Sequence, residues 1–427
     1  MRTVAFHTLG CKVNQYDSQA MLELFEQAGY EPREFSEAAD VYVVNTCTVT
    51  GTGDKKSLNA VRRALRTNPH AEVVIAGCLA QRDGEKLLET GARLVIGNTR
   101  RGEVVRLLEE AVANGQRVAA VTDILRTPYE PLNISSHEGH TRAVLKIQEG
   151  CDRYCTYCII PYVRGGIRSR APEDIHREAC RLAQAGFQEL VLTGIHLTSY
   201  GRDLEEKTLL DAVRACDVAG VRRIRLGSLE PVIVTEEFAE ALKKEEKVCP
   251  QFHLALQSGS DTVLKRMRRR YTRSEFRRAC ALLRAAFPGC AITTDVITGF
   301  PGETEAEFSE TVNFSREIGF ARMHVFPYSA RQGTPAAQMP GQVPKAIREE
   351  RARTLIAEGM DMGRKYRESQ IGSIVEVLVE EIDEDGMAHG YTGQYIACSL
   401  RNGEPGEIYP VYVTGMDADG LVGDIER

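Results

Sequence analysis

Residues 144–158 read VLKIQEGCDRYCTYC, in which a run of strand-forming residues meets three closely spaced cysteines. The apolar pattern of residues 144–149 predicts a β-strand, and Cys151, Cys155 and Cys158 (the loop trio) follow at its carboxyl end, where barrel enzymes carry their active sites. Three thiolates in one tight loop can hold three irons of a 4Fe-4S cluster and leave the fourth iron open to a substrate or cofactor. Zinc sites usually take a further protein ligand elsewhere in the chain, which this loop does not supply. The loop therefore predicts an iron–sulfur cluster.

The strand before the loop trio is the first of six strand-like segments that alternate with helical stretches. The six segments are VLKIQE, ELVLTG, RRIRLG, FHLALQ, AITTDVITGF and MHVFPYS. Six βα units predict an open, partial (β/α)6 barrel rather than a full barrel of eight units. We place this domain at residues 142–369.

The regions on either side predict two further domains. In residues 1–126 the segments VAFHTL, VYVVNT, EVVIAG and LVIG alternate with helical patterns, which predicts a doubly wound parallel sheet of the α/β class. Residues 127–141 mix Pro, Ser, Asn and Gly without a period and predict a linker. Residues 370–427 contain short strands with glycine turns, which predict a small all-β barrel.

The composition indicates the compartment and the charge distribution. The chain has 427 residues and twelve cysteines, with neither a secretory signal pattern nor an apolar run long enough for a membrane span. We therefore expect a cytoplasmic protein that needs no membrane. In the cytoplasm, clustered cysteines bind metal or do chemistry rather than form disulfides. The net charge is −6 overall, but residues 371–427 carry twelve acidic residues against only Arg401 and Arg427, a net charge of −10.

A second set of cysteines, the strand trio, follows three predicted strands of the first domain directly. Its members are Cys11, Cys47 and Cys78. Because the carboxyl ends of neighbouring parallel strands meet at one edge of a sheet, these thiols can converge and hold a second cluster. The alternative is three buried structural cysteines, since cysteine is among the most buried residue types.

The CxxxCxxC spacing of the loop trio, with Tyr157 before its last cysteine, resembles the signature of the radical S-adenosylmethionine (SAM) superfamily. The resemblance implies that the open iron chelates SAM and that the reduced cluster cleaves it to methionine and a 5′-deoxyadenosyl radical. It also implies SAM contacts from the segments TGIHLTSYG, RLGSLEP and DVITGFPGET. The positions concerned are Tyr157, Gly194, His196, Glu230, Gly299 and Gly302. Glu230 can instead be a cap before a helix, and the three glycines can be turn residues required by backbone geometry.

The strand trio, the loop trio and the C-terminal module, which resembles a TRAM domain, together resemble the methylthiotransferases over essentially the whole chain. The segments TLGCKVNQYDS, GCDRYCTYCIIPYVRG and HLALQSGSDTVLKRMRRRYT look most like the subgroup acting on N6-threonylcarbamoyladenosine in tRNA. The pair after the first cysteine is Lys12-Val13 here; the isopentenyladenosine subgroup shows a different pair and the ribosomal-protein subgroup commonly has a proline.

The family resemblance implies replacement of the C2 hydrogen of the modified adenosine, beside the anticodon, with a methylthio group. Two SAM molecules are used: one gives the methyl group to sulfur carried at the second 4Fe-4S cluster, and the other gives the radical. The implied partners are the tRNA anticodon loop, SAM, a sulfur donor and a low-potential electron donor such as a flavodoxin or ferredoxin. Three alternatives stay open: methylthiolation of a ribosomal protein side chain, methylthiolation of isopentenyladenosine in tRNA, and a non-catalytic iron–sulfur RNA-binding module.

Two groups of basic residues are candidates for neutralising tRNA phosphates. Arg164, Arg168 and Arg170 follow the loop trio, and a dense basic run lies at residues 265–273. The alternative for the second group is a solvated helix face. The acidic C-terminal module would repel phosphate and suits a basic protein partner better.

Overall fold

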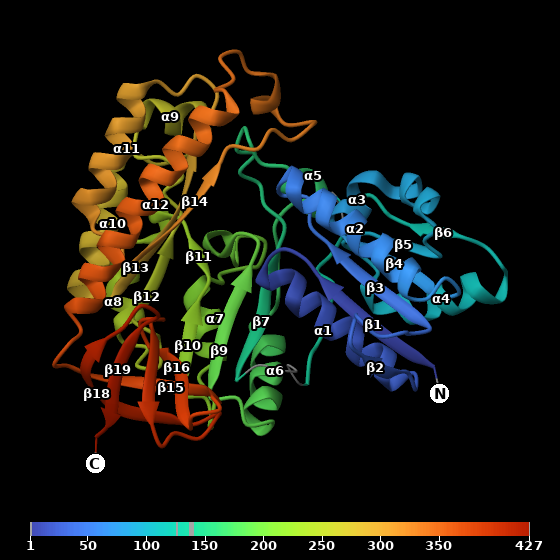
Figure 1. Cartoon of the computed structure of the whole chain (residues 1–427), viewed down its shortest axis with the longest axis horizontal. Coiled ribbons are helices and arrows are strands. Elements are labelled where there is room, and N and C mark those ends of the chain that lie inside the picture. Colours follow the sequence, from blue (N-terminus) through green and yellow to red (C-terminus); the bar gives the residue numbers. More distant parts are fainter. Residues whose placement is uncertain (1, 125–126, 136–140, 427) are drawn as a thin grey trace.

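The computed structural model describes residues 2–124, 127–135 and 141–426, which form two α/β units and a small β-barrel (Figure 1). The fold class predicted from the sequence is confirmed. No helix in these residues is both long and apolar enough to cross a bilayer.

The N-terminal unit is a parallel sheet of strand order β2-β1-β3-β4-β5-β6. Its strands are β1 (Thr3–Thr8), β2 (Glu31–Arg33), β3 (Val41–Thr46), β4 (Glu72–Gly77), β5 (Leu94–Ile96) and β6 (Val118–Ala120). Its helices are α1 (Lys12–Gln27), α2 (Gly51–Thr67), α3 (Cys78–Asp83) and α4 (Val104–Ala113), with 3-10 turns η1 (Gly84–Thr90) and η2 (Arg101–Glu103). Apolar residues of α1 and α4 cover one face of the sheet, and those of α2 and α3 cover the other. This is the doubly wound arrangement.

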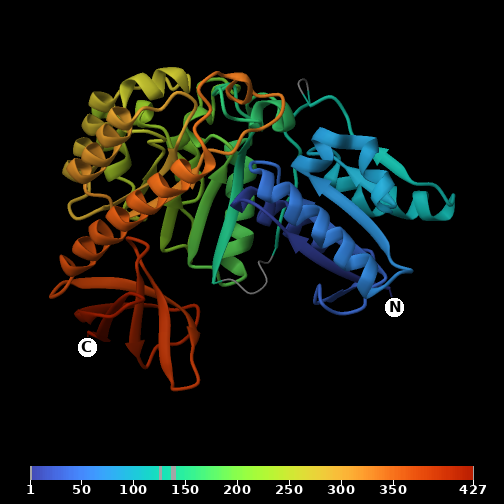
Figure 2. The ribbon, with the colours of Figure 1, turned by 45° about the horizontal axis from the view of Figure 1, so that its top comes forward.

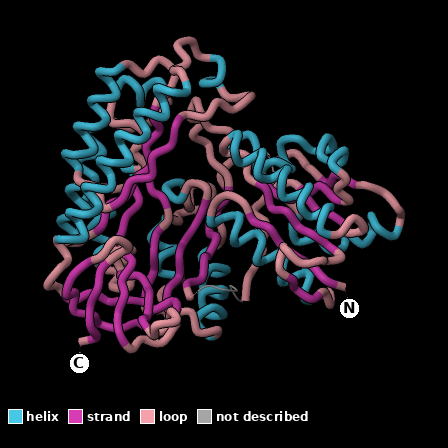
Figure 3. The backbone as a smooth tube through the Cα atoms, viewed as in Figure 1, coloured by secondary structure: helices cyan, strands magenta, loops and turns pink. Residues whose placement is uncertain are grey.

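The central unit is an open barrel with helices on its outer side (Figure 3). Its six main strands are β7 (Arg142–Glu149), β9 (Glu189–Gly194), β10 (Arg223–Leu226), β12 (Gln251–Leu254), β13 (Ala291–Thr298) and β14 (Arg322–Pro327). Two short strands add to them, β8 (Arg168–Ser169) and β11 (Ser228–Leu229). They form sheets of order β10-β9-β7-β8 and β11-β12-β13-β14, and an isolated bridge pairs Ile224 of β10 with Val248, which precedes β12.

Helices and 3-10 turns connect the barrel strands. The helices are α5 (Ile160–Arg164), α6 (Pro172–Gln184), α7 (Leu209–Ala215), α8 (Glu236–Lys243), α9 (Asp261–Arg266), α10 (Arg273–Ala286), α11 (Glu305–Ile318) and α12 (Lys345–Glu368). The 3-10 turns are η3 (Leu197–Ser199), η4 (Pro231–Ile233) and η5 (Pro335–Gln338). Capping boxes at Thr208, Thr272 and Thr304 satisfy backbone N–H groups at the starts of α7, α10 and α11.

Helix α1 joins the N-terminal unit to the central barrel. Met21 and Phe25 pack on the N-terminal sheet, whereas Tyr16 and Ala20 belong to the core of the barrel. The Tyr16 hydroxyl donates a hydrogen bond to Glu178 of α6 at 2.9 Å. One helix therefore fixes the strand ends of both units relative to each other.

The C-terminal unit is a closed barrel of order β15-β16-β17-β19-β18. Its strands are β15 (Ile374–Ile382), β16 (Met387–Thr392), β17 (Ala397–Arg401), β18 (Ile408–Met416) and β19 (Leu421–Ile425). It follows directly after α12 and lies below the central barrel in the view of Figure 2. Ion pairs from Glu380 to Arg142 at 2.7 Å and from Glu376 to Arg222 at 3.0 Å place it at the amino-terminal ends of β7 and β10. Part of the acidic surplus is thus used in docking within the chain.

Candidate functional site

The loop trio lies at the carboxyl end of β7 in a loop held at both ends. Gly150 precedes it with φ +73°, and a Cβ there would stand 1.8 Å from the carbonyl oxygen of Gly166, so this position requires glycine. The Cys151 amide donates to the Gly165 carbonyl at 2.9 Å, and the Thr156 amide donates to the Met267 carbonyl at 3.1 Å. The cysteines are therefore presented by a fixed backbone.

Burial favours the protonated thiol at two positions of the loop trio in the absence of a metal. It raises the pKa of Cys151 to about 11 and that of Cys158 to about 12. The guanidinium of Arg269 lies against the third thiol, and its Nη1 donates to Cys155 Sγ at 3.3 Å. Iron must displace the thiol protons when it binds. A buried cation against the sulfur is then suited to the negative charge of a thiolate-bound cluster.

Glu230, which follows β11, is linked to the loop trio by Arg269, which contacts both the Glu230 carboxylate and the Cys155 sulfur. Its carboxylate is 2.8 Å from Arg269 Nη2, 3.0 Å from Arg153 Nη2 and 3.2 Å from His196 Nε2. Burial acts to raise the pKa of Glu230, but the hydrogen bond from His196 and the charge of Arg269 outweigh it and lower the pKa to about 2. The structure thus brings two of the predicted SAM positions, His196 and Glu230, into contact with each other next to the loop trio.

The other predicted SAM positions are more dispersed. Gly194 ends β9 and faces the central cavity, and a Cβ there would stand 2.8 Å from Gln148 Cβ. The Tyr157 ring packs edge-on against Phe300 with centroids 6.4 Å apart. Gly299 and Gly302 have φ of +67° and +76°, so both occupy turns that favour glycine. Their contact with SAM stays a prediction.

The strand trio lies at the ends of β1, β3 and β4, which are neighbours in the sheet. Cys11 is the N-cap residue of α1, and Cys78 is the first residue of α3. A Cβ on Gly10 would stand 3.0 Å from Cys47 Sγ, so the first two strand ends meet. The Asn14 amide group donates to the carbonyls of Leu9 and Thr46 at 2.6 and 3.0 Å and ties these ends together.

The donors of the strand trio suit an iron–sulfur cluster. The pKa of Cys47 is raised to about 11, mainly by burial. Arg164 Nε donates to Cys78 Sγ at 3.2 Å, and Asn98 Nδ2 lies 3.6 Å from the same sulfur. Among the described residues no three Cys, His, Asp or Glu side chains form a site for a single metal ion. A cluster instead takes one thiolate on each of several irons, and the arginine supplies positive charge next to the thiols.

Helix α5 and the residue before it connect the two trios. Cys158 ends one trio, and the next residue, Ile159, packs with Val163 against Cys78 of the other. Arg164 closes α5 and reaches Cys78. It also pairs with Glu149 of β7 at 2.7 Å, within a buried ionic network at the junction of the two units. The network also contains Asp17, Arg101 and Lys146, and Glu130 pairs with Arg101 at its edge.

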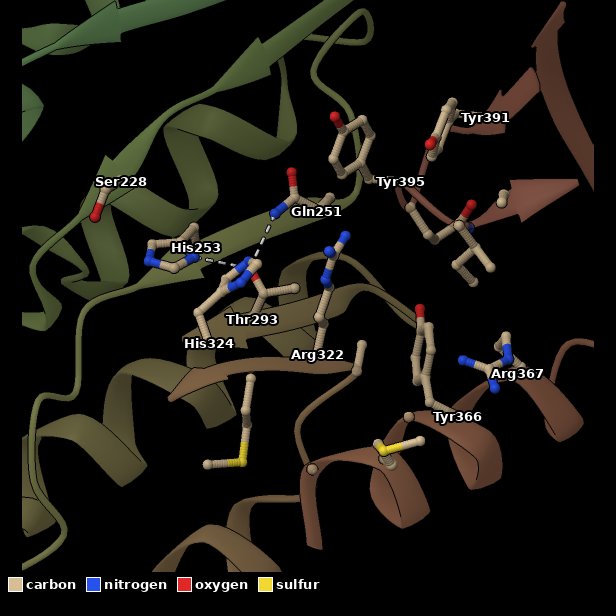
Figure 4. Close-up of a pocket in the computed structure, with 18 of the residues that line it drawn as sticks. Ser228, Gln251, His253, Thr293, Arg322, His324, Tyr366, Arg367, Tyr391 and Tyr395 are labelled. Carbon is tan, nitrogen blue, oxygen red and sulfur yellow. Dashed lines mark hydrogen bonds between the residues drawn. The ribbon is translucent and has the colours of Figure 1, made fainter. Parts of the chain in front are cut away.

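A cavity of about 1160 Å³ lies between the barrel strands, α12 and the C-terminal unit, and it shares lining residues with a second cavity of about 620 Å³. Both are lined by Cys11, Lys12, His253, His324 and Tyr395. All three units therefore contribute to its wall. The close-up in Figure 4 shows side chains of the barrel strands facing Tyr391 and Tyr395 of the C-terminal unit across this space.

The polar groups in the cavity are partly paired. His253 Nε2 lies 3.3 Å from the Asp295 carboxylate, and its Nδ1 lies 3.1 Å from Thr293 Oγ1. Burial and the charge of Arg322 lower the pKa of His324. Burial, together with the charges of two arginines, lowers the pKa of Lys12 to about 8. This cavity therefore has a positive wall near Cys11.

Comparison with known proteins accounts for all three units. Residues 3–97 match an uncharacterized protein family, UPF0004, residues 145–315 match the radical SAM superfamily, and residues 368–419 match the TRAM domain. The chain is 44% identical to the threonylcarbamoyladenosine tRNA methylthiotransferase MtaB of Bacillus subtilis, over 95% of this chain and 91% of that protein. This chain belongs to the radical SAM methylthiotransferase family.

The methylthiotransferase is also similar to a second sequence relative and to a solved structure. It is 38% identical to the tRNA-2-methylthio-N(6)-dimethylallyladenosine synthase of a Parafrankia species, over 99% of this chain and 86% of that protein. The radical SAM methyltransferase TsrM of Kitasatospora setae, solved with cobalamin and a 4Fe-4S cluster, has a TM-score of 0.58 at 16% identity. That match covers 79% of this chain and 77% of the other. It shows a shared fold.

The structure corrects the assignment of several arginines of the methylthiotransferase to phosphate binding. Arg164, Arg168 and Arg170 are buried, and Arg170 pairs with Glu178. In the basic run, Arg269 is turned inward to Glu230. Two others are also paired with acids of the chain, Arg266 with Glu307 and Arg273 with Asp261. The exposed members of the run are Lys265, Arg268 and Arg270.

Proposed function

We propose that this methylthiotransferase acts on N6-threonylcarbamoyladenosine beside the anticodon of tRNA and replaces its C2 hydrogen with a methylthio group. The observation that carries the proposal is the identity of 44%, over nearly the full length, with a protein named for this activity. The arrangement of the site supports it: both cysteine trios flank α5, and Cys11 also faces a cavity of about 1160 Å³. Pockets of a few hundred to a thousand Å³ hold small organic ligands, so a nucleoside flipped out of the anticodon loop fits this space.

The chain uses SAM and two 4Fe-4S clusters. When bound, these groups supply the radical that removes hydrogen from a strong, weakly acidic aromatic C–H bond, together with the sulfur and methyl group to be added. The protein binds and orients them. The loop trio and the strand trio would hold the two clusters, and Arg269 and Arg164 would place a positive charge against each.

The polar residues near the loop trio provide binding groups for SAM. Glu230 is ionised at neutral pH and fixed by Arg153, His196 and Arg269, so its carboxylate is held ready to accept hydrogen bonds from ribose hydroxyls. Gly194, at the end of β9, allows the backbone to approach Gln148 closely, since a Cβ there would stand 2.8 Å from Gln148 Cβ. Holding the reacting groups at short range is a proximity effect, in which fixed geometry replaces a random encounter.

Several finer features belong to the same proposal. A sulfur donor and a low-potential electron donor such as a flavodoxin or ferredoxin must serve this chemistry, and the substrate tRNA and reduced thiols are typical of the cytoplasm. We also divide the chain into a domain of residues 1–126, a linker of residues 127–141, a radical SAM domain of residues 142–369 and a TRAM domain of residues 370–427. The gap between β6 and β7 and the end of α12 at Glu368 support this division.

Analysis of nucleosides from a strain lacking the gene tests the substrate. We expect loss of 2-methylthio-N6-threonylcarbamoyladenosine and its return when the gene is restored. Loss of the methylthio form of isopentenyladenosine instead would favour the activity named for the Parafrankia relative. Loss of a methylthio amino acid from a ribosomal protein, with both nucleosides unchanged, would favour a protein substrate.

A further inference from the structure

Lys12 presents an unpaired cation to the cavity, next to Cys11. It is the first residue of α1, and it lines both parts of the cavity together with Cys11, His253 and Tyr395. Its side chain is accessible, but the space that it faces is enclosed by protein on several sides. In the described part of the chain the structure records no hydrogen bond or ion pair for its ammonium group.

Three cations surround the ring of Tyr395. Lys12 Nζ lies 5.7 Å from the ring centroid, and the guanidinium carbons of Arg142 and Arg225 each lie 4.8 Å from it. The main chain of the same hairpin is fixed by Arg225, whose Nη1 donates to the Gly393 carbonyl at 2.8 Å. The N-terminal and central units therefore supply three positive charges around one ring of the C-terminal unit, and this ring lines the cavity.

The nearest acidic residues form their direct ion pairs with the two arginines. Arg142 pairs with Glu380 at 2.7 Å, and Arg225 pairs with Glu189 at 2.7 Å. Glu189 also lies 3.5 Å from Arg223, so it is shared. A cation held in an enclosed space without a counter-ion is unfavourable. An anionic ligand bound there would remove this cost.

The substituent of the proposed substrate ends in such an anion. A carbamoyl group joins N6 of the adenine to the amino group of threonine and leaves the threonine carboxylate and hydroxyl free. The carbamoyl N–H can donate to N1 of the ring, which folds the threonyl group toward the edge of the base that carries C2. The isopentenyl substituent is a hydrocarbon with no charge. A cation next to the sulfur-bearing side of the site can therefore distinguish the two nucleosides.

We propose that Lys12 determines specificity by binding the carboxylate of the threonylcarbamoyl group in the cavity beside Cys11. This inference rests on the proposed function and names the residue that recognises its substrate. Arg142 and Arg225, held on Tyr395, keep the local charge positive and fix the wall against which the group lies. A site that pairs a cation in an enclosed space with a substrate anion disfavours analogues that lack the anion, because the cation is then left unpaired.

The test compares anticodon stem-loop RNAs that carry either N6-threonylcarbamoyladenosine or its threonine carboxamide, which has nearly the same shape but no charge. Anaerobically reconstituted enzyme is used, and kcat and KM are measured for both RNAs. We expect the parent enzyme to prefer the acid over the amide by about 10- to 100-fold in kcat/KM, mainly through KM. Lys12→Met should bring this ratio toward one, and Lys12→Arg should restore most of it.

Controls separate the possible failures. Lys345→Met removes an exposed lysine on α12 and should leave the preference unchanged. Iron content and 5′-deoxyadenosine formation are measured for each variant, since Lys12 adjoins Cys11. A parent enzyme that treats acid and amide alike overturns the inference without any variant, as does a Lys12→Met enzyme that keeps the full preference. A parent enzyme inactive on both RNAs but active on isopentenyladenosine overturns the proposed function itself.

Discussion

The loop trio occupies eight consecutive residues after one strand, whereas the strand trio is collected from three strand ends between residues 11 and 78. The geometry of the first depends on one loop and its hydrogen bonds to residues 165 and 267. The geometry of the second depends on the register of β1, β3 and β4 and on the amide of Asn14 that ties two of their ends. In spite of this difference, each trio has one buried arginine that donates to a cysteine sulfur. The two trios therefore share a positively charged environment, although the chain assembles them in different ways.

Loss of the loop trio should have the largest effect. Cys151→Ala removes a thiol from the loop that we assign to the SAM-cleaving cluster, so both 5′-deoxyadenosine formation and thiolation should fall below detection. Chromatography of reaction products under anaerobic reduction measures this. Cys180→Ala, a partly buried cysteine on α6 outside both trios, is the matched control and should behave like the parent. Retention of 5′-deoxyadenosine by Cys151→Ala would contradict the assignment.

Loss of the strand trio should separate the two halves of the reaction. Cys11→Ala should abolish thiolation but keep SAM cleavage within about threefold of the parent, because the loop trio is held independently. Iron should fall from about eight to about four atoms per chain, the content of one 4Fe-4S cluster instead of two. Iron and sulfide analysis after reconstitution checks this. An iron content equal to that of the parent would rule out a second cluster at this trio.

Glu230→Gln should have a smaller effect on activity, and it should alter SAM binding at the loop trio but not the strand trio. The change removes the anion that Arg153, His196 and Arg269 surround, and we expect SAM to bind about 10-fold more weakly. Equilibrium dialysis with labelled SAM measures this, and the iron content should not change. Unaltered SAM affinity would return Glu230 to a structural role.

The pH dependence of Glu230 follows from its pKa of about 2, below its ordinary value of 4.5. A lowered pKa in the folded protein means that the ionised carboxylate stabilises the fold above about pH 4.5 and that this contribution is lost as the pH falls toward 2. The parent should therefore lose more stability in this interval than Glu230→Gln does. Unfolding followed by circular dichroism at a series of pH values checks the difference.

The positions of both trios could be predicted from the sequence, because the three cysteines of the strand trio and the first cysteine of the loop trio each come just after a recognisable strand. Local spacing revealed the loop trio, and the common edge of a parallel sheet revealed the strand trio. The cavity could not be predicted, since Tyr391 and Tyr395 reach it from a barrel far along the chain. The assignment of arginines to phosphate binding was wrong where they are paired within the protein, because a basic stretch of sequence does not show the acids that pair with it. These acids are Glu178 for Arg170 and Glu307 for Arg266.

Replacing the two arginines should give the smallest and most selective effect. Arg164→Lys and Arg269→Lys keep the positive charge but lose the planar guanidinium that donates to sulfur. Loss of a hydrogen bond to a cluster ligand should lower the reduction potential of that cluster by about 50 mV and leave the other unchanged. Redox titration followed by electron paramagnetic resonance, with the other cluster removed by Cys11→Ala or Cys151→Ala, measures each potential separately. If Arg164→Lys shifted the potential of the loop-trio cluster instead, the charges would not be divided between the trios as the hydrogen bonds to Cys78 and Cys155 indicate.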